Sequence, residues 1–287
     1  MRKDKIGLAL LSVICALLST NCMPRVERPS VPSGPPQRIV SLVPAVTEIL
    51  FAIGAGEKLV GVTQHCYYPP QARTITSIGG FSGATMSVEQ IRVLNPDLVF
   101  ISEDMHGRIL SLLDELQINS FAVEPRSFEE VFDTINMIGA VTGFQQSAQQ
   151  LINGMKDKIS LIEENIQGRQ RPTVFWLLEE NPLMTAGGGT FVSEAIDLGG
   201  GRNIFGDLRE HWPLVSRELV LLREPEWVFI GDDIGNNVEL QSSPFWQTIN
   251  AVKDGRIAII NVDILYRYGP RLVDGVASIA KILHGLE

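Results

Sequence analysis

The stretch Gln64-His-Cys-Tyr-Tyr68 gathers side chains suited to holding a metal or a flat ligand. The imidazole of His65 suits an axial position on cobalt or iron, and a phenolate from Tyr67 or Tyr68 suits ferric iron. Each has an alternative role, because a loop histidine can simply satisfy its own hydrogen bonds and a tyrosine before two prolines can simply pack. We interpret Cys66 as a small buried apolar residue rather than a thiolate ligand.

Other common kinds of chemical site are not predicted. His106, His211 and His284 form no His-x-His or His-Glu-x-x-His pattern, which argues against a bare zinc or manganese site built on several histidines. The triple glycines at 187–189 and 199–201 lack the P-loop lysine and the full dinucleotide spacing. We therefore interpret both glycine runs as turns at helix boundaries.

An exported enzyme on an α/β hydrolase-like scaffold is the main alternative class of protein. Gly79-Gly-Phe-Ser-Gly83 places its serine one position away from that of a Gly-x-Ser-x-Gly nucleophile elbow, and no strand precedes it. No paired carboxylates stand beside a histidine at a convincing spacing. We therefore predict no catalytic residues and expect the chain to bind its ligand without changing it.

An internal repeat places one carboxylate at the same point of two segments. Residues 87–101 (SVEQIRVLNPDLVFI) align without gaps with residues 216–230 (SRELVLLREPEWVFI). Each segment encodes a helix start, about two helical turns, a proline break, an acidic residue and a buried strand. The leading serine suits an N-cap, so Glu89 and Glu218 fall in first turns, where the helix dipole favours a carboxylate. Two explanations of the glutamate pair stay open: capping of the two helices, and docking onto paired arginine sites of a symmetric partner.

The elements that must position these residues follow an alternating pattern. Short apolar runs predict strands at 38–43, 59–62, 98–101, 120–123, 173–178, 227–230 and 257–260. Amphipathic stretches predict helices at 47–53, 87–94, 109–116 and 272–286. Interleaved strands and helices indicate βαβ units and largely parallel sheets. Residues 145–170 carry apolar side chains at helical spacing between the two halves.

The predicted fold class is therefore α/β, with two pseudo-symmetric α/β lobes joined by a long backbone helix. We place the N-terminal lobe at 38–127, a connecting helical segment at 128–171 and the C-terminal lobe at 172–287. A helical connector is stiffer than the crossing strands of hinge-bending receptors, so we expect limited closure of the lobes.

The first 37 residues differ from the rest of the chain. A short basic start and an apolar run over 6–18 predict a signal peptide at 1–21, and Cys22 follows as a lipid attachment site, with Asn21 where a small residue is usual. Five prolines between 23 and 36 predict an extended tether over 22–37. We expect an exported chain, lipid-anchored to a membrane and facing the periplasm or the cell exterior, with a soluble secreted product or an uncleaved anchor helix as the alternatives.

The charge balance excludes one class of partner. The formal net charge is −9 and no basic stripe appears, whereas nucleic-acid binding needs clustered lysine and arginine.

Several motifs together resemble a known family. In order and spacing, the chain from residue 38 to near its end is similar to the helical-backbone (class III) substrate-binding proteins of ABC importers, which include vitamin B12-binding and iron-chelate-binding members. The motifs that carry the resemblance are Ser41-Leu-Val-Pro-Ala-Val-Thr-Glu48, Gly61-Val-Thr, Tyr68-Pro-Pro-Gln71, Ser87-Val-Glu89, Asn95-Pro-Asp-Leu-Val99, Gly199-Gly-Gly-Arg-Asn-Ile-Phe205, Trp212-Pro-Leu-Val-Ser-Arg-Glu218 and Pro270-Arg271. The resemblance implies a monomer that docks Glu89 and Glu218 on arginines of a permease dimer in the cytoplasmic membrane.

The resemblance also implies a ligand held between the lobes. The ligand-binding residues that we predict are Pro44, Ala45, His65, Tyr67, Phe81, Trp212, Asp263, Tyr266 and Arg267. His65 stands where the vitamin B12-binding members have tyrosine, Phe81 stands where they have tryptophan, and an extra stretch at 82–85 enlarges the neighbouring loop. These departures leave a corrinoid, haem and a ferric chelate open as the cargo. We predict no resident cofactor and no metal site of the protein's own.

Overall fold

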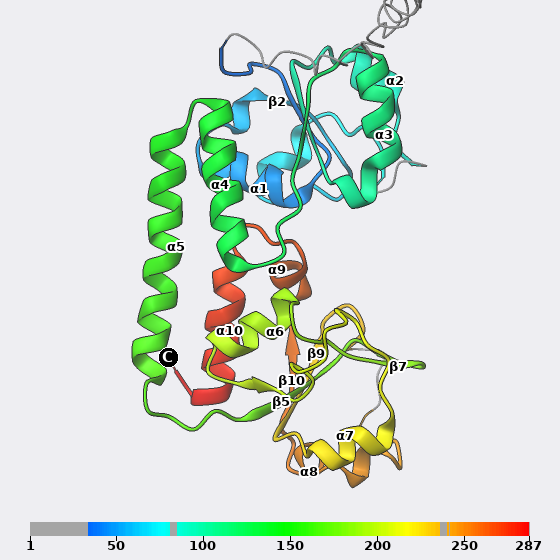
Figure 1. Ribbon diagram of the computed structural model, residues 1–287, viewed down its shortest axis with the longest axis vertical. Helices are drawn as coiled ribbons and strands as arrows, with labels where there is room; N and C mark the ends of the chain where they lie inside the picture. Colours follow the sequence, from blue (N-terminus) through cyan, green and yellow to red (C-terminus); the bar gives the residue numbers. More distant parts are fainter. Residues whose placement is uncertain (1–33, 81–84, 236–239, 241, 287) are drawn as a thin grey trace, which may run out of the picture. The chain divides into compact units, whose positions relative to one another are not determined.

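Two four-stranded parallel sheets organise the computed structural model, which describes residues 34–80, 85–235, 240 and 242–286 (Figure 1). All of these residues belong to one compact unit, Val31–Glu287. The N-terminal sheet has the order β2-β1-β3-β4, from Leu59–Val62, Ile39–Ser41, Leu98–Ile101 and Ser120–Ala122. The C-terminal sheet has the order β8-β5-β9-β10, from Arg202–Asn203, Thr173–Leu177, Trp227–Gly231 and Ile257–Ile260. The two orders correspond strand for strand, which confirms the predicted pseudo-symmetric α/β lobes.

Helices cover both sheets. In the N-terminal lobe these are α1 (Pro44–Ala52), α2 (Val88–Val93) and α3 (Glu103–Glu115), with 3-10 turns at Gly56–Lys58 and Pro70–Thr74. In the C-terminal lobe they are α6 (Phe191–Leu198), α7 (Arg217–Arg223), α8 (Asn250–Lys253), α9 (Val262–Tyr266) and α10 (Leu272–His284), with a 3-10 turn at Trp246–Thr248. A short hairpin of β6 (Glu179–Glu180) and β7 (Leu183–Met184) projects from the second sheet.

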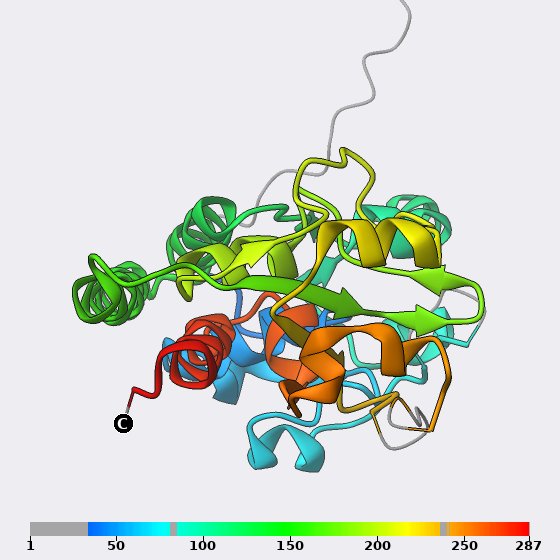
Figure 2. The ribbon, with the colours of Figure 1, turned by 90° about the horizontal axis from the view of Figure 1, so that it is seen from below.

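The connection between the lobes is a helical hairpin rather than a single helix. Helix α4 (Phe128–Thr142) ends at Gly143, whose φ of 83° is in the left-handed region that glycine adopts freely. The chain then turns back into α5 (Gln145–Ile166), which passes from one lobe to the other and packs against both α4 and α10. Seen from below, α5 and α10 lie side by side at one edge (Figure 2). Helix α5 is thus the backbone helix that the sequence predicts.

Two helices begin earlier than the sequence predicts. Helix α1 begins at Pro44 instead of Thr47, because proline is well suited to a first turn that needs no amide donor. Helix α3 begins at Glu103 instead of Ile109, because the hydroxyl of Ser102 accepts the amide of Met105 and caps a polar first turn. The backbone of α3 departs from helical geometry at His106, so its two parts are joined by a kink.

The repeated segments have matching local structure. The Oγ atoms of Ser87 and Ser216 accept the amide hydrogens of Gln90 and Leu219, each at 3.1 Å. Both short helices end in a left-handed residue, at Asn95 and at Glu224, with φ of 45° and 44°. The repeat is therefore a duplicated structural module, and both serines are the N-caps that the sequence predicts.

The acidic residue after each proline has the same structural role in both lobes. Asp97 accepts the backbone amides of Gln37 and Arg38 at 2.8 and 3.0 Å. Glu226 accepts the amide of Thr173 at 2.8 Å. In both sheets the carboxylate thus fastens the start of the neighbouring strand.

The N-terminal predictions fall outside the part of the chain that the structure describes. These are the signal peptide at 1–21, Cys22 and most of the tether. Within the described residues, no helix combines the length and the apolar character needed to cross a membrane.

Candidate ligand-binding cleft

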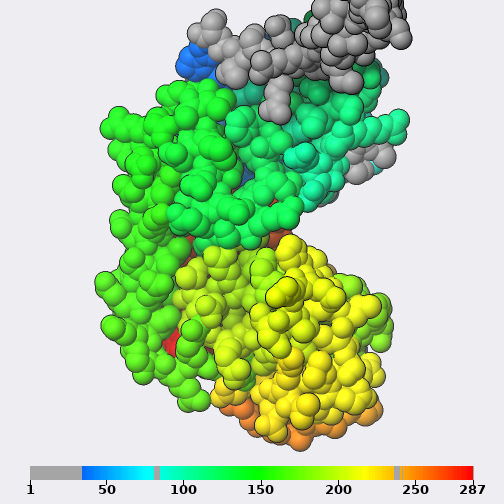
Figure 3. Space-filling view, in the orientation of Figure 1, coloured from blue at the N-terminus to red at the C-terminus, as the bar shows by residue number. Residues whose placement is uncertain are grey.

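A cavity of about 400 Å³ lies between the two lobes. The space-filling view shows the molecule hollowed there, between the upper and the lower lobe (Figure 3). The N-terminal lobe lines it with Asp104, Glu124, Pro125 and Arg126. The C-terminal lobe lines it with Gly189, Thr190, Phe191, Val192, His211, Trp212, Leu265, Tyr266 and Tyr268. The volume falls in the range usual for small-molecule sites.

The parallel sheets explain why these residues meet. Asp104 follows the carboxyl end of β3, Glu124 follows that of β4, and α9 follows that of β10. Loops at the carboxyl ends of parallel strands share one edge of a sheet, and ligands of open α/β sheets bind there. Each lobe turns this edge toward the cavity.

Aromatic rings form the wall of the cavity on the C-terminal lobe. Tyr266 meets Trp212 edge to face at 5.9 Å between ring centroids, and Phe191 stacks on Tyr268 at 5.6 Å. Trp212 keeps 41% of its surface exposed. Burial raises the pKa of the Tyr268 phenol to about 12, and the carboxylates of Glu124 and Asp104 add to the shift. Burial also raises the pKa of the Tyr266 phenol, and tyrosine is neutral at physiological pH even at its ordinary pKa, so the wall suits an uncharged, flat surface.

Polar groups face this wall from the N-terminal lobe. The Ser102 hydroxyl donates to the carboxylate of Glu124 at 2.7 Å, and the guanidinium of Arg126 lies 3.8 Å from the carboxylate of Asp104. The cavity therefore pairs an aromatic wall with charged anchors of both signs.

A second set of contacts joins the lobes beside the cavity. The Tyr67 hydroxyl donates to Asp263, and Arg267 donates from Nε to Asp263 at 2.9 Å and from Nη1 to the carbonyl of His65 at 2.6 Å. The Arg267 guanidinium also lies over the Tyr67 ring, 4.3 Å from its centroid. Burial raises the pKa of Asp263, but the hydrogen bonds from Tyr67 and Arg267 and the nearby arginine charges outweigh it, so the pKa lies below the ordinary value. We call Tyr67, Asp263 and Arg267 the cleft latch.

A family model for the periplasmic binding proteins matches residues 39–263, most of the chain. The chain belongs to the periplasmic binding protein family. As such it is a periplasmic or extracellular binding protein and not an enzyme.

Named relatives support this membership. The chain is 30% identical over 257 residues to the uncharacterized ABC transporter substrate-binding lipoprotein YvrC of Bacillus subtilis, a match that covers 87% of this chain and 80% of the relative. The crystal structure of the vitamin B12-binding protein BtuF of Vibrio cholerae superposes with a TM-score of 0.74 at 29% identity, covering 87% and 97% of the two chains. The haem-binding protein RhuT of Roseiflexus sp. RS-1 gives a TM-score of 0.76 at 25% identity, covering 88% and 99%.

The structure distributes the predicted ligand-binding residues of this binding protein over three environments. Trp212 and Tyr266 line the cavity, whereas Tyr67, Asp263 and Arg267 form the cleft latch. His65 is half-buried at the latch, where its Nε2 lies 3.3 Å from the side-chain amide nitrogen, Nε2, of Gln64. The remaining three are Pro44 and Ala45, which are buried at the start of α1 and do not line the cavity, and Phe81, which lies outside the described residues.

Several cavity residues were not among the predicted site residues. They are Asp104, Glu124, Arg126, Phe191 and Tyr268. The first three lie within three residues of the carboxyl ends of predicted strands, so the rule that ligands bind there was a usable signal for them. Phe191 had no such signal, because its place in the cavity depends on how the C-terminal lobe packs.

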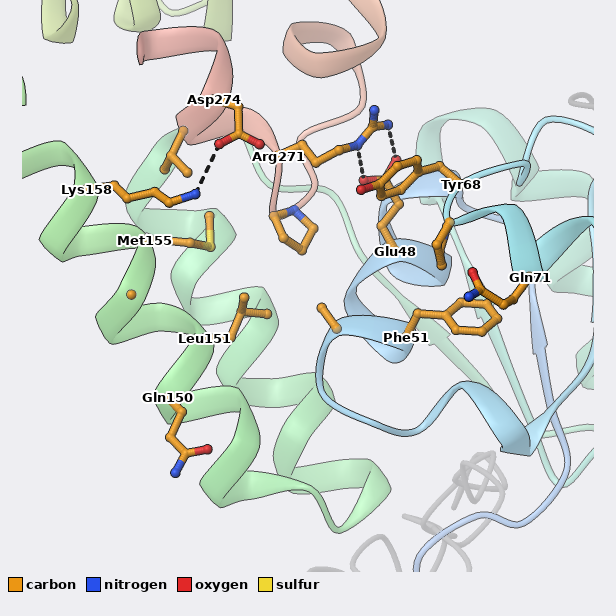
Figure 4. Close-up of a pocket in the computed structure, with 15 residues that line it drawn as sticks. Glu48, Phe51, Tyr68, Gln71, Gln150, Leu151, Met155, Lys158, Arg271 and Asp274 are labelled. Carbon is orange, nitrogen blue, oxygen red and sulfur yellow. Dashed lines mark hydrogen bonds and ion pairs between the residues drawn. The ribbon is translucent and has the colours of Figure 1, made fainter. Parts of the chain in front are cut away.

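An ion pair on another side of the lobe junction borders a second cavity, of about 660 Å³ (Figure 4). Arg271 donates to both carboxylate oxygens of Glu48, at 2.9 and 2.6 Å, and its guanidinium lies 3.7 Å from the centroid of the Tyr68 ring. The Glu48 side chain is only 3% exposed. The pair joins α1 of one lobe to the start of α10 in the other.

Replacing Glu48 with glutamine tests this pair. Glu48→Gln leaves a largely buried guanidinium without its counter-charge, and we expect a loss of about 3 kcal/mol in the free energy of unfolding. The matched control is Lys158→Gln, which breaks the solvent-exposed pair with Asp274 and changes the free energy by less than about 1 kcal/mol. Urea unfolding measures both, and equal effects would contradict the assignment.

The pH dependence of stability tests the cleft latch. Tyr67→Phe removes one hydrogen bond to Asp263, so the pKa of this carboxyl group rises toward its ordinary value. A carboxyl group with a lowered pKa stabilises the fold above its unfolded-state pKa, and the stabilisation disappears as pH falls through the folded-state pKa. We expect Tyr67→Phe to be less stable than the parent chain at pH 7, with the difference closing toward pH 2.5. Urea unfolding across this range should show no such closing gap for Tyr68→Phe.

Proposed function

We propose that this chain captures a metal-bearing macrocycle or chelate between its lobes and delivers it to the permease of an ABC importer. As a substrate-binding protein of this kind, it works with a permease and a small-molecule ligand. The observation that carries the finer proposal is the cavity itself, where the aromatic wall of Trp212, Tyr266, Phe191 and Tyr268 faces the charged anchors Asp104, Glu124 and Arg126.

A corrinoid or an iron chelate is the cargo that this chemistry favours. A flat macrocycle presents a broad apolar face, which rings that stand at the cavity wall can contact without losing hydrogen bonds. Its polar substituents then meet carboxylates and a guanidinium on the opposite lobe. Relatives named for vitamin B12 and for haem bind ligands of this class, which supports the proposal.

Delivery is proposed to use the two repeated glutamates. Glu89 on α2 and Glu218 on α7 are exposed, one on each lobe. Hydrogen bonds from the backbone amide of Glu218 and from the Ser216 hydroxyl lower the pKa of Glu218, so it remains ionised at neutral pH. Ionised carboxylates pair well with arginine, and two pairs fix an orientation that one pair leaves free.

Membrane attachment through a lipid on Cys22 completes the proposal. The apolar run that precedes this cysteine supports it, and so does the relative from Bacillus subtilis named as a lipoprotein. A lipid at the end of a proline-rich tether would keep the binding lobes near the permease.

Trp212 provides a test of the cavity. Trp212→Ala removes a large part of the aromatic wall, and we expect binding of the true cargo to weaken at least tenfold, or about 1.4 kcal/mol. Titrations with cyanocobalamin, haemin and a ferric hydroxamate, followed by visible absorbance, distinguish the three cargo classes and measure the Kd. Leu214→Ala is the matched control, because Leu214 is an exposed apolar residue nearby that does not line the cavity. An unchanged Kd for Trp212→Ala would remove this side chain from the site.

The glutamate pair provides a test of delivery. In the double variant Glu89→Ala, Glu218→Ala, we expect uptake by host cells to be lost while the Kd for the cargo stays unchanged. The matched control is Glu115→Ala with Glu163→Ala, two exposed glutamates outside the repeat. Loss of cargo affinity in the first double variant, or normal uptake by it, would refute the docking role.

A further inference from the structure

Two apolar side chains at equivalent positions of the repeat are highly exposed to solvent. Val93 is 84% exposed and Leu222 is 79% exposed, the two highest values among the large apolar residues that the structure describes, ahead of Leu214 at 62%. In the gap-free alignment of the repeat, Val93 matches Leu222 just as Glu89 matches Glu218. Single exposed apolar residues are common on protein surfaces and need no explanation. A matched pair at equivalent positions of two lobes is less easily attributed to chance.

Helix geometry places each of these residues beside a docking glutamate. Ile91 in α2 and Val220 in α7 are fully buried and fix the inward face of each helix. Positions two residues before and two residues after a buried residue are turned about 200° from it, which points them outward. The glutamate and the aliphatic residue are four positions apart, so they are neighbours on that outward face. Each lobe therefore presents a carboxylate next to an exposed aliphatic side chain.

The fold itself gives these two side chains no role. The buried residue of each helix secures it to the core, and the serine caps secure its start. Valine also has a lower helix propensity than the unbranched polar residues that suit an exposed position. Packing therefore leaves the shared apolar character of Val93 and Leu222 unexplained.

We propose that Val93 and Leu222 are the apolar anchors of the docking surface, each seated in an apolar depression beside the arginine that receives the neighbouring glutamate. This inference rests on the proposed function and commits to one partner, a twofold-symmetric permease in the membrane. A duplicated patch fits a partner that offers the same surface twice. Helices α2 and α7 lie one in each lobe, both on the side away from α5 (Figure 1).

In the proposed docking, the charge pairs and the apolar contacts have different roles. Charge pairs steer encounter and orientation but are screened by salt when exposed. An aliphatic side chain that leaves water contributes a term that salt does not screen. Apolar anchors would therefore retain the docked complex at ionic strengths that weaken the charge pairs.

Site-specific photocrosslinking tests the partner. A benzophenone amino acid is placed at position 93 or 222 of the full chain in host cells, and at position 161 as the control, because Leu161 is an exposed residue of α5. We expect positions 93 and 222, but not 161, to crosslink to a polypeptide that mass spectrometry identifies as an ABC permease subunit. Crosslinks to a second copy of this chain, to lipid only, or to nothing would overturn the proposal.

Polar substitution tests the energetic role. For the double variant Val93→Gln, Leu222→Gln, we expect the initial rate of cyanocobalamin, haemin or ferric hydroxamate uptake, whichever is the cargo, to fall at least tenfold with Kd and thermal unfolding unchanged. Leu161→Gln should keep the parent rate. Normal uptake by the double glutamine variant, together with failure of the Glu89 and Glu218 double variant, would refute the apolar anchors alone. Normal uptake by the glutamate variant would instead refute the docking surface as a whole.

Discussion

The cleft depends on two arginines that reach across the junction of the lobes. Arg267 and Arg271 are four residues apart in the C-terminal lobe, and each contacts the N-terminal lobe. Burying a charge is costly unless its partner is well placed. The two hydrogen bonds from Arg271 to Glu48 therefore favour one relative position of the lobes. The same holds for Arg267, which needs a backbone carbonyl from one lobe and Asp263 from its own. These contacts set the separation across which the aromatic wall faces the charged anchors.

Duplication explains why one architecture supports both capture and delivery. Each lobe repeats a unit in which a capped short helix leads through a left-handed residue into a buried strand, and in which an acidic residue holds the start of the neighbouring strand of the sheet. The carboxyl ends of the strands supply the cavity, whereas the short helices supply exposed side chains away from it. In the function proposed above, ligand and partner meet different parts of the same repeated unit. The proposal therefore expects substitutions on α2 or α7 to change docking without altering the wall around Trp212.

The sequence predicted the fold far better than it predicted the cavity. Strands such as Leu59–Val62 and Leu98–Ile101 were located to the residue, because short apolar runs between turn signals are typical of buried parallel strands. The start of the backbone helix at Gln145 was predicted, but α4 was not separated from the connecting helical segment at 128–171, because that whole segment has helical character. Glu124 follows a predicted strand and so had a usable signal, whereas Tyr268 was missed as a site residue because it meets the N-terminal lobe only when the two lobes pack. Pairing across 100 residues or more leaves no local pattern in the chain.

A stiff junction has a consequence for how such a receptor gains affinity. Helix α5 and the neighbouring α10 form a continuous helical edge, and the arginine contacts add fixed points beside the cleft. Large closure would break a nearly buried ion pair, at a cost that ligand contacts would have to offset. The binding surface is therefore largely preformed, and affinity follows from complementarity to Trp212 and its neighbours rather than from closure. If α2 and α7 dock as proposed, limited movement of the lobes means that the permease meets nearly the same surface in the free and the loaded states. The proposal then requires that the permease recognise the loaded state through small shifts between the lobes, because it contacts both of them at once.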